Sequence, residues 1–392
     1  MKIVHDKFKV HSLTGRITFE LMLKAFKAVK RNRGAAGIDK VSIQQYEKDL
    51  IPNLTTLMQE LKTGTYQPLP LKRVHIPKGY DATRPLGIPA VRCRVAQEVT
   101  RRLINPTFEK IFHNSSFGFR KDRNCHQAVE QTIDLAQQGF RWVVEVDIKG
   151  FFDNLPHELI MESVAAKISD GNILNLIERF LKSGVMEEGK LSPTVRGAPQ
   201  GGVISPLLAN IVLNHLDWHM ENKAYKFVRY ADDFVTLCKT QAQAQEALDF
   251  ISSLLKEMGL EVSQEKTRIC RFSQGFDFLG FHISSRGVTM RKKSVEKFKE
   301  TIRKTTKRSH NLDQKVIGKL NQVIRGTVNF FATKFSTIRQ QLMMLDGWIR
   351  TRIRSMKFKR KWTTDHYRLR NKQIERMGLL SCSRHGSARM RC

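Results

Sequence analysis

FVRYADDFVTLC, residues 227–238, carries the clearest structural signal in the chain, because two apolar runs flank a pair of acidic residues. These runs predict two strands joined by an acidic turn that carries Asp232 and Asp233. A second strand signal lies upstream in RWVVEVDIKGFF, residues 141–152, where apolar side chains alternate on either side of Asp147. The two patterns place three carboxylates at the ends of apolar strands.

Carboxylates among apolar strands are costly to bury unless a cation compensates them, and oxygen ligands suit Mg²⁺. We therefore expect a Mg²⁺ site shared by the two strand ends, where two ions about 4 Å apart activate a 3′-hydroxyl and stabilise a pyrophosphate leaving group. Neighbouring strand residues point to opposite faces, so Asp232 is expected to be the closer ligand and Asp233 a weaker one. The carbonyl of Ile148 is a further candidate ligand. The alternative is that the acidic pair only favours a turn.

The charge of the chain is strongly positive and unevenly distributed. Its 392 residues contain 68 Lys and Arg against 37 Asp and Glu, a formal net charge of +31. Residues 291–392 contain 28 Lys and Arg against 6 Asp and Glu, whereas residues 1–290 contain 40 against 31. A basic surface can serve solubility alone, but this concentration indicates a C-terminal domain that binds nucleic acid.

The basic C-terminal region also has a helical pattern. Apolar residues recur at helical spacing through residues 295–356 and predict three amphipathic helices with basic outer faces. The third ends in RTRIRSMKFKRKW, with seven cations from Arg350 to Lys361, more than a helix dipole explains. Across the whole chain, the candidate contacts to nucleic acid are Arg31, Arg33, Lys266, Arg350, Arg352, Arg354 and Lys357.

The remaining segments predict helices mixed with short strands, which is an α+β pattern. Helices are expected at 17–30, 46–61, 91–111, 157–182, 204–224 and 241–258, with a Pro-punctuated hairpin region at 66–89. No run of 18 apolar residues and no secretory signal is evident, so a membrane protein is not expected. The six Cys lack zinc-site spacing and are expected to be reduced thiols.

Further motifs occur in a definite order along the chain. They are RPLGIP at 84–89, SSFGFRKDRNCHQAV at 115–129, GAPQGGVISPLLANIVL at 197–213, GLEVSQEKT at 259–267 and FDFLGF at 276–281, preceded by RNRGAAGID. Together with YADD at 230–233 and VVEVDIKGFFDNLPH at 143–157, they resemble the reverse transcriptase family, specifically the group II intron-encoded reverse transcriptases, or maturases. The resemblance extends over about residues 17–390.

This resemblance implies a right-hand polymerase, with fingers and palm at residues 1–290 and an all-α basic thumb or maturase domain at residues 291–392. It implies an RNA-directed DNA polymerase that uses two Mg²⁺ ions, for which Mn²⁺ can substitute, with Asp147, Asp232 and Asp233 as catalytic residues. The expected partners are an RNA template and primer, deoxynucleoside triphosphates, group II intron RNA and target DNA. A role in intron splicing and mobility follows, in the cytoplasm of a bacterium and near its nucleoid.

The same resemblance assigns further residues to the incoming nucleotide. They are Lys72, Lys78, Arg84, Phe152 and Gln200. Three cations on a Pro-stiffened hairpin could hold a triphosphate, and the alternative is that they are plain surface cations. Phe152 would pack under the sugar and clash with a 2′-hydroxyl. The alternative is that Phe152 is a core residue, since Phe151 is adjacent and only one of the two is expected to face the site. The glutamine would lie near the nucleotide or the template, next to glycines that allow close approach of the backbone.

Two other functions stay open at this point. A maturase could act mainly by binding RNA, although the three intact carboxylates favour catalysis. A host-recruited reverse transcriptase of the same type could serve defence or repair, and the sequence separates this alternative poorly. No Cys-paired HNH endonuclease motif is evident, so DNA cleavage is expected to come from another source.

Overall fold

The computed structural model describes residues 9–77, 83–198, 201–362 and 364–391, and the chain divides into two compact units. Unit 1 comprises Met1–Ala128 and Val144–Arg268, and unit 2 comprises Val129–Val143 and Ile269–Cys392. Both contain helices and strands, so the expected α+β class is confirmed.

Helices form most of unit 1. They are η1 (Thr14–Arg16), α1 (Phe19–Arg31), α2 (Ile43–Lys48), α3 (Leu50–Thr63), α4 (Val91–Glu109), α5 (Cys125–Gln137), α6 (Phe151–Asn154), α7 (His157–Ala165), α8 (Gly171–Leu181), α9 (Ser205–Asn222) and α10 (Gln241–Glu257). The division between the units falls within α5, so its last turns belong to unit 2.

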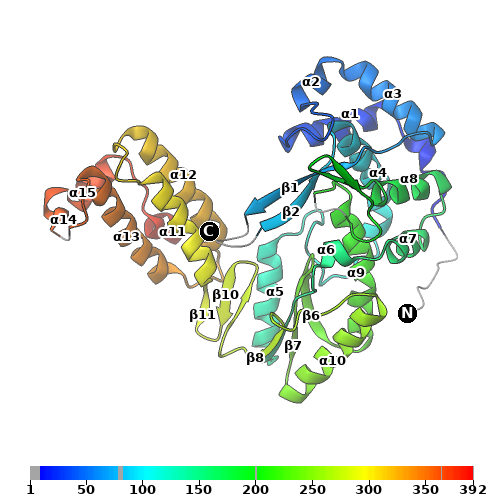
Figure 1. The fold of residues 1–392 in the computed structure, drawn as a ribbon. Helices are drawn as coiled ribbons and strands as arrows, with labels where there is room; N and C mark the ends of the chain where they lie inside the picture. Colours follow the sequence, from blue (N-terminus) through cyan, green and yellow to red (C-terminus); the bar gives the residue numbers. More distant parts are fainter. Residues whose placement is uncertain (1–8, 78–82, 199–200, 363, 392) are drawn as a thin grey trace. The chain divides into compact units, whose positions relative to one another are not determined.

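Two four-stranded sheets have most of their residues in unit 1, while Trp142, Val143 and residues 269–271 fall in unit 2. One has the order β2-β1-β4-β5, and the other has the order β6-β7-β3-β8. Their strands are β1 (Leu71–Pro77), β2 (Thr83–Ile88), β3 (Trp142–Val146), β4 (Val185–Glu187), β5 (Lys190–Ser192), β6 (Lys226–Tyr230), β7 (Asp233–Cys238) and β8 (Arg268–Arg271). In Figure 1 the hairpin of β6 and β7 lies beside α9 and α10, and both helices contact it.

Helix α9 is buried on nearly all sides because its sequence is apolar all round rather than on one stripe. Pro206 occupies the first turn, where the missing N–H of proline costs nothing. Even the polar side chains of Asn210 and Asp217 are buried in this helix. A buried polar side chain needs hydrogen-bond partners, and Asn210 and Asp217 share one, Arg229 on β6.

The expectation of one helix over residues 157–182 was wrong. The chain breaks between α7 and α8, where Ile168 forms a parallel bridge with Val10. Asp170 then caps α8 by accepting from the backbone N–H of Ile173, and it also accepts two hydrogen bonds from Thr14. The break therefore combines a local capping signal, Asp170 followed by Gly171, with pairing to the N-terminal segment.

Unit 2 joins a three-stranded antiparallel sheet to a group of helices. The strands are β9 (Phe276–Phe278), β10 (Phe281–Ser284) and β11 (Gly287–Met290), in the order β11-β10-β9. The helices are α11 (Lys292–Thr305), α12 (Gln314–Phe331), α13 (Arg339–Lys357), α14 (Asp365–Arg368), α15 (Asn371–Arg376) and α16 (Cys382–Arg391). The ring of Phe281 packs on Phe330, Phe331 and Phe335, which holds the sheet against α12.

The three basic helices expected from the sequence are confirmed as α11, α12 and α13. Residue 290, expected to end the fingers and palm, is the last residue of β11. The compact unit 2, however, already contains β9–β11 together with the helices that follow them. The functional boundary at residue 290 therefore stays a prediction. Among the described helices, none is long and apolar enough to span a lipid bilayer.

Candidate active site

The acidic turn is a two-residue loop between β6 and β7. Tyr230 pairs with Asp233, so Ala231 and Asp232 form the loop and Asp233 begins β7. Ala231 has a φ of 58°, a left-handed conformation that costs a non-glycine residue roughly 1–2 kcal/mol. Asp232 is half-buried and Asp233 is exposed. Asp232 lies in the loop rather than in a strand, so strand alternation does not apply to the pair, and the stronger ligand role of Asp232 stays a prediction.

A fully buried arginine supports this turn from beneath. The side chain of Arg229 is 0% exposed, and its Nε and Nη2 donate to the two carboxylate oxygens of Asp217 at 2.7 and 2.5 Å. Its Nη1 donates to Asn210 Oδ1 and to the carbonyl of Ala231, both at 2.9 Å. Two side chains of α9 thus fix a guanidinium that in turn holds the backbone of the strained loop.

The loop that carries SSFGF covers the turn on another side. A Cβ on Gly118 would collide with the backbone nitrogen of Ala231, so only glycine fits there without displacement of the turn. The Gly118 carbonyl accepts from Asn210 Nδ2 at 2.7 Å, and Phe117 N–H donates to the Arg229 carbonyl at 2.9 Å. The sequence analysis missed Arg229, Asp217, Asn210 and Gly118. The available signal was a cation inside an apolar strand and an acid inside an apolar helix.

Asp147 follows directly after β3. Its carbonyl accepts from Ser263 N–H at 2.7 Å, and its N–H donates to Thr267 Oγ1 at 3.3 Å, so the 263–267 turn fixes its backbone. Its carboxylate oxygen Oδ2 lies 3.0 Å from Lys266 Nζ. The Lys266 side chain is 60% exposed, so this ion pair is solvated and its ammonium can leave at little cost.

One cavity of about 350 Å³ brings the three carboxylates together. Its described lining consists of Thr83, Pro85, Asp147, Ile148, Gly150, Phe151, Phe152, Asp153, Asp232, Asp233 and Lys266. The cavity thus gathers residues from both strand motifs, the GLEVSQEKT motif and the hairpin of β1 and β2, which are far apart in the sequence.

Comparison with known proteins identifies the family of the chain. Residues 76–283 match the family model described as reverse transcriptase (RNA-dependent DNA polymerase), and residues 295–376 match the group II intron maturase-specific domain. The chain belongs to the group II intron-encoded reverse transcriptases. It is an RNA-directed DNA polymerase by family, with a maturase-specific domain in its C-terminal unit.

Relatives in this family differ in length. Protein YkfC of Escherichia coli (strain K12) is 34% identical over 305 residues, which are 67% of this chain and 80% of YkfC. Group II intron-encoded protein LtrA of Lactococcus lactis subsp. cremoris is 32% identical over 349 residues, 71% of this chain and 57% of LtrA. The putative COX1/OXI3 intron 1 protein of Saccharomyces cerevisiae is 29% identical over 71% of this chain and 39% of its own length. The chain thus spans little more than half of LtrA.

A solved structure also aligns with the chain. Telomerase from Candida albicans, in complex with a fragment of telomeric RNA, has a TM-score of 0.45 and 13% identity, over 86% of this chain and 66% of that one. This likeness is too distant to support an argument.

The two neighbouring phenylalanines differ in their place at the cavity that Asp147, Asp232 and Asp233 line. The expectation that the strand runs to residue 152 was wrong, because β3 ends at Val146 and Gly150, with a φ of 53°, leads into the short helix α6. Phe151 is only 2% exposed and belongs to the core, whereas Phe152 is half-buried. Both contribute to the wall of the cavity, but Phe152 has the more accessible ring.

The structure describes only some of the residues expected to hold the nucleotide. Lys78, Gln200 and the side chain of Arg84 lie outside the described residues, and Lys72 is exposed on β1. The hairpin of β1 and β2 reaches the cavity through Thr83 and Pro85, which flank Arg84 in the sequence. The loop after Gln200 also approaches this hairpin, because a Cβ on Gly201 would collide with the Gly87 carbonyl.

Some of the candidate RNA-binding side chains form hydrogen bonds within the protein, and others are exposed. Arg31 and Arg33 are exposed at the end of α1, away from the described cavity lining. Arg352 donates to the Thr306 carbonyl at 2.7 Å, at the end of α11. Arg354 donates to the Leu369 carbonyl at 2.9 Å. Arg350 is half-buried, Lys357 is exposed, and the RNA contacts of all of them stay a prediction.

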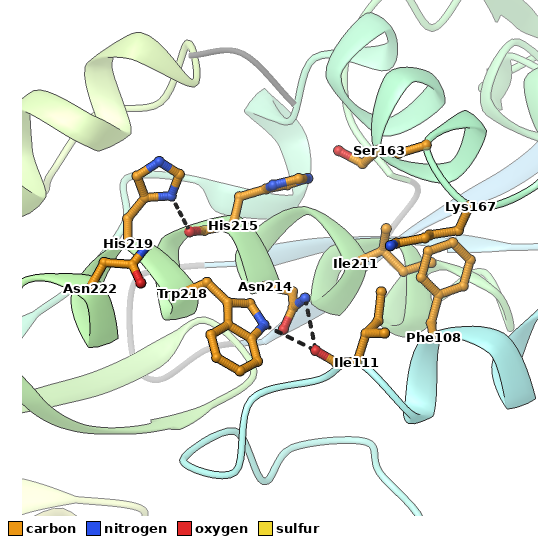
Figure 2. Close-up of a pocket in the computed structure, with 11 residues that line it drawn as sticks. Phe108, Ile111, Ser163, Lys167, Ile211, Asn214, His215, Trp218, His219 and Asn222 are labelled. Atoms are coloured by element: carbon orange, nitrogen blue, oxygen red, sulfur yellow. Dashed lines mark hydrogen bonds between the residues drawn. The ribbon is translucent and has the colours of Figure 1, made fainter. Parts of the chain in front are cut away.

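A second cavity of about 330 Å³ lies among α4, α7 and α9 (Figure 2). Trp218 Nε1 donates to the Ile111 carbonyl at 3.0 Å, and His219 Nδ1 donates to the His215 carbonyl at 2.7 Å. Burial, aided by repulsion from His219, lowers the pKa of His215 to about 4, so its imidazole is neutral at pH 7. The described lining contains no carboxylate, so this cavity lacks the metal ligands that polymerisation requires.

Proposed function

We propose that this protein copies RNA into DNA at the cavity lined by Asp147, Asp232 and Asp233, and that unit 2 binds group II intron RNA to assist splicing and mobility. The convergence of three carboxylates from separate motifs on one cavity is the observation that carries the proposal. A protein that only binds RNA has no need for such a cluster of negative charge, because it would repel phosphate.

The carboxylates fit divalent cations by their chemistry. Carboxylate oxygens, with the Ile148 carbonyl nearby, are hard ligands of the kind that Mg²⁺ and Mn²⁺ prefer. When bound, two Mg²⁺ ions supply Lewis-acid activation of the 3′-hydroxyl and stabilise the leaving pyrophosphate. Within the described residues no three His, Cys, Asp or Glu side chains form a ready-made metal cluster, so we expect the carboxylates to converge on binding.

The chain's own residues then position the reactants. Lys266 lies beside Asp147 and can exchange this carboxylate for a phosphate oxygen of the bound nucleic acid. Phe152 offers an apolar surface for the sugar and restricts the space for a 2′-hydroxyl. The cations Lys72, Lys78 and Arg84 belong to the hairpin whose Thr83 and Pro85 line the cavity, and we assign them to the triphosphate together with Gln200.

The RNA-binding part of the proposal rests on the charge of unit 2. The pKa of the Arg352 guanidinium is lowered by burial and by repulsion from Arg303 and Arg308. Bound phosphate relieves such repulsion, which favours polyanions on this surface. We assign Arg350, Arg352, Arg354 and Lys357 to intron RNA, and Arg31 and Arg33 to the template and primer. The proposed setting is the bacterial cytoplasm, where intron RNA and target DNA are both accessible.

Primer extension on an RNA template with Mg²⁺ tests the catalytic assignment. The double variant Asp232→Ala/Asp233→Ala should lose extension by far more than the roughly 10- to 100-fold that follows loss of a residue merely supporting a metal ligand. Its affinity for RNA should stay close to that of the wild type. Asp249→Ala removes an exposed carboxylate of α10 outside the described cavity lining and is the matched control. Near wild-type extension by the double variant would refute the assignment.

A further test addresses the biological role. RNA that co-purifies with the protein from its natural host should be enriched in group II intron sequences. Enrichment of unrelated host or phage RNA would instead support the alternative of a host-recruited enzyme in defence or repair.

A further inference from the structure

Two large aromatic side chains are strongly exposed near the end of α13. The side chain of Trp362 is 63% exposed in the segment between α13 and α14, and that of Tyr367 on α14 is 72% exposed. Single exposed apolar residues are common on protein surfaces, so exposure alone indicates nothing. The side chains around these two rings indicate what they could bind.

Trp362 is held in place by a cation. The Arg360 guanidinium carbon lies 4.7 Å from the centre of the Trp362 ring. Arg360 Nη2 donates to Asp365 Oδ1 at 2.9 Å, and the Asp365 side chain is only 1% exposed. This charge-assisted hydrogen bond lowers the pKa of Asp365, so the carboxylate stays ionised and keeps Arg360 in position. A buried anchor therefore fixes a cation that restrains an exposed indole.

The neighbouring aromatic rings have similar companions. The ring of His366 lies 3.9 Å from that of Tyr367, measured between centroids. The Arg368 guanidinium lies 5.1 Å from the centre of the Phe358 ring. Aromatic and cationic side chains thus lie close together in the sequence between Phe358 and Arg368. Restrained rings lose little conformational entropy when a ligand stacks on them.

The strong positive charge of this segment favours a negatively charged ligand. The cations between residues 350 and 372 are Arg350, Arg352, Arg354, Lys357, Lys359, Arg360, Lys361, Arg368, Arg370 and Lys372. Asp365 is the one acidic residue in the same interval of the sequence, and Arg360 neutralises it. Interfaces between proteins are depleted of lysine, whereas proteins that bind single strands combine cations for phosphate with aromatic rings for bases.

We propose that Trp362 and Tyr367 form a stacking platform for unpaired bases of the bound RNA, while the surrounding cations hold its phosphates. The proposal rests on RNA binding by unit 2 and specifies which part of the RNA this surface recognises. Duplex RNA keeps its bases stacked inside the helix, so the platform favours loops, bulges and single strands.

Equilibrium binding of two labelled RNAs, an unstructured 12-nucleotide strand and a 12-base-pair duplex, tests the platform. Trp362→Ala and Tyr367→Ala should each weaken binding of the single strand by roughly 5- to 150-fold, the range for loss of one stacked base. Duplex affinity should change less than about twofold. Because stacking releases no counterions, the slope of log Kd against log salt should stay the same. Trp362→Phe and Tyr367→Phe should retain most of the affinity.

Met343→Ala and Met344→Ala are matched controls, because both remove exposed apolar side chains of α13 in the same unit. The platform is refuted if the aromatic variants bind the single strand like the wild type, or if they lose single-strand and duplex binding equally. Thermal unfolding of each variant shows whether an equal loss reflects misfolding. A wild-type protein that binds neither RNA would refute RNA binding by unit 2 and the platform with it, whereas normal wild-type binding with unaffected variants refutes the platform alone.

Discussion

At the scale of single residues, Arg229 is the side chain on which the geometry of the acidic turn depends. It is buried with both partners from α9, and it holds the carbonyl of a loop residue with positive φ. The carboxylates of Asp232 and Asp233, for which we propose a catalytic role, occupy that loop and the strand position after it. The buried ion pair of Arg229 and Asp217 thus fixes the backbone that carries the half-buried Asp232 and the exposed Asp233.

Arg229→Met should therefore destabilise the protein strongly. It leaves Asp217 as an uncompensated buried charge, which costs about 3–5 kcal/mol. The double variant Arg229→Met/Asp217→Leu should recover much of this loss, because neither charge remains buried. Urea unfolding measures both free energies, and a loss below about 1 kcal/mol in the single variant would contradict the account.

Lys266, unlike Arg229, is expected to contribute little to the stability of the fold. Its ion pair with Asp147 is largely solvated, so Lys266→Ala should change the free energy of unfolding by less than about 1 kcal/mol. Removal of this ammonium also removes a competitor for the Asp147 carboxylate. The Mg²⁺ concentration that gives half-maximal primer extension should therefore fall, as a Mg²⁺ titration can measure. A requirement for more Mg²⁺ would show that Lys266 does not compete with the ion.

At the scale of secondary structure elements, α9 links stability to pH. His215 on this helix has a pKa of about 4 in the folded protein, against about 6.5 when unfolded. Between these values the unfolded state binds a proton that the folded state does not, so stability should fall as the pH falls from about 6.5 to 4. The loss from this residue is about 3 kcal/mol.

His215→Asn should flatten this part of the dependence of unfolding free energy on pH, because it removes the titrating group. The matched control is His310→Asn, which removes an exposed histidine of unit 2 and should leave the dependence unchanged. Chemical unfolding at several pH values gives the comparison. An unaltered pH dependence in His215→Asn would mean that other groups, such as His113 and His157, whose pKa values burial also lowers, account for it.

The same scale shows what a sequence can predict. The strand, turn and strand at Asp232 and Asp233 are predicted by the apolar runs around the acidic pair. The basic helices are predicted by apolar residues that recur at helical spacing. The break between α7 and α8 is accompanied by the pairing of Val10 with Ile168, which local periodicity does not contain. The support of the turn by Arg229 likewise requires that α9 and β6 be neighbours in space. Contacts between distant segments are thus the part that was missed.

At the scale of the whole molecule, the positive charge divides into cations with different roles. Arg352 and Arg354, which we assign to RNA, also donate hydrogen bonds within unit 2, whereas Lys357 and Lys361 are exposed. A net charge alone does not distinguish these roles. The exposed lysines are free to meet phosphate, and neutralising them tests how much of the charge serves binding.

Lys357→Ala/Lys361→Ala should weaken binding to single-stranded and duplex RNA alike, because phosphate contacts are independent of base pairing. Each lost phosphate contact should reduce the slope of log Kd against log salt by about 0.7–0.9. Lys256→Ala, which removes an exposed lysine of α10 in unit 1, is the control and should leave the slope unchanged. A salt titration of both variants decides the matter, since an unchanged slope in the double variant would mean that these lysines form a solvated face that RNA does not touch.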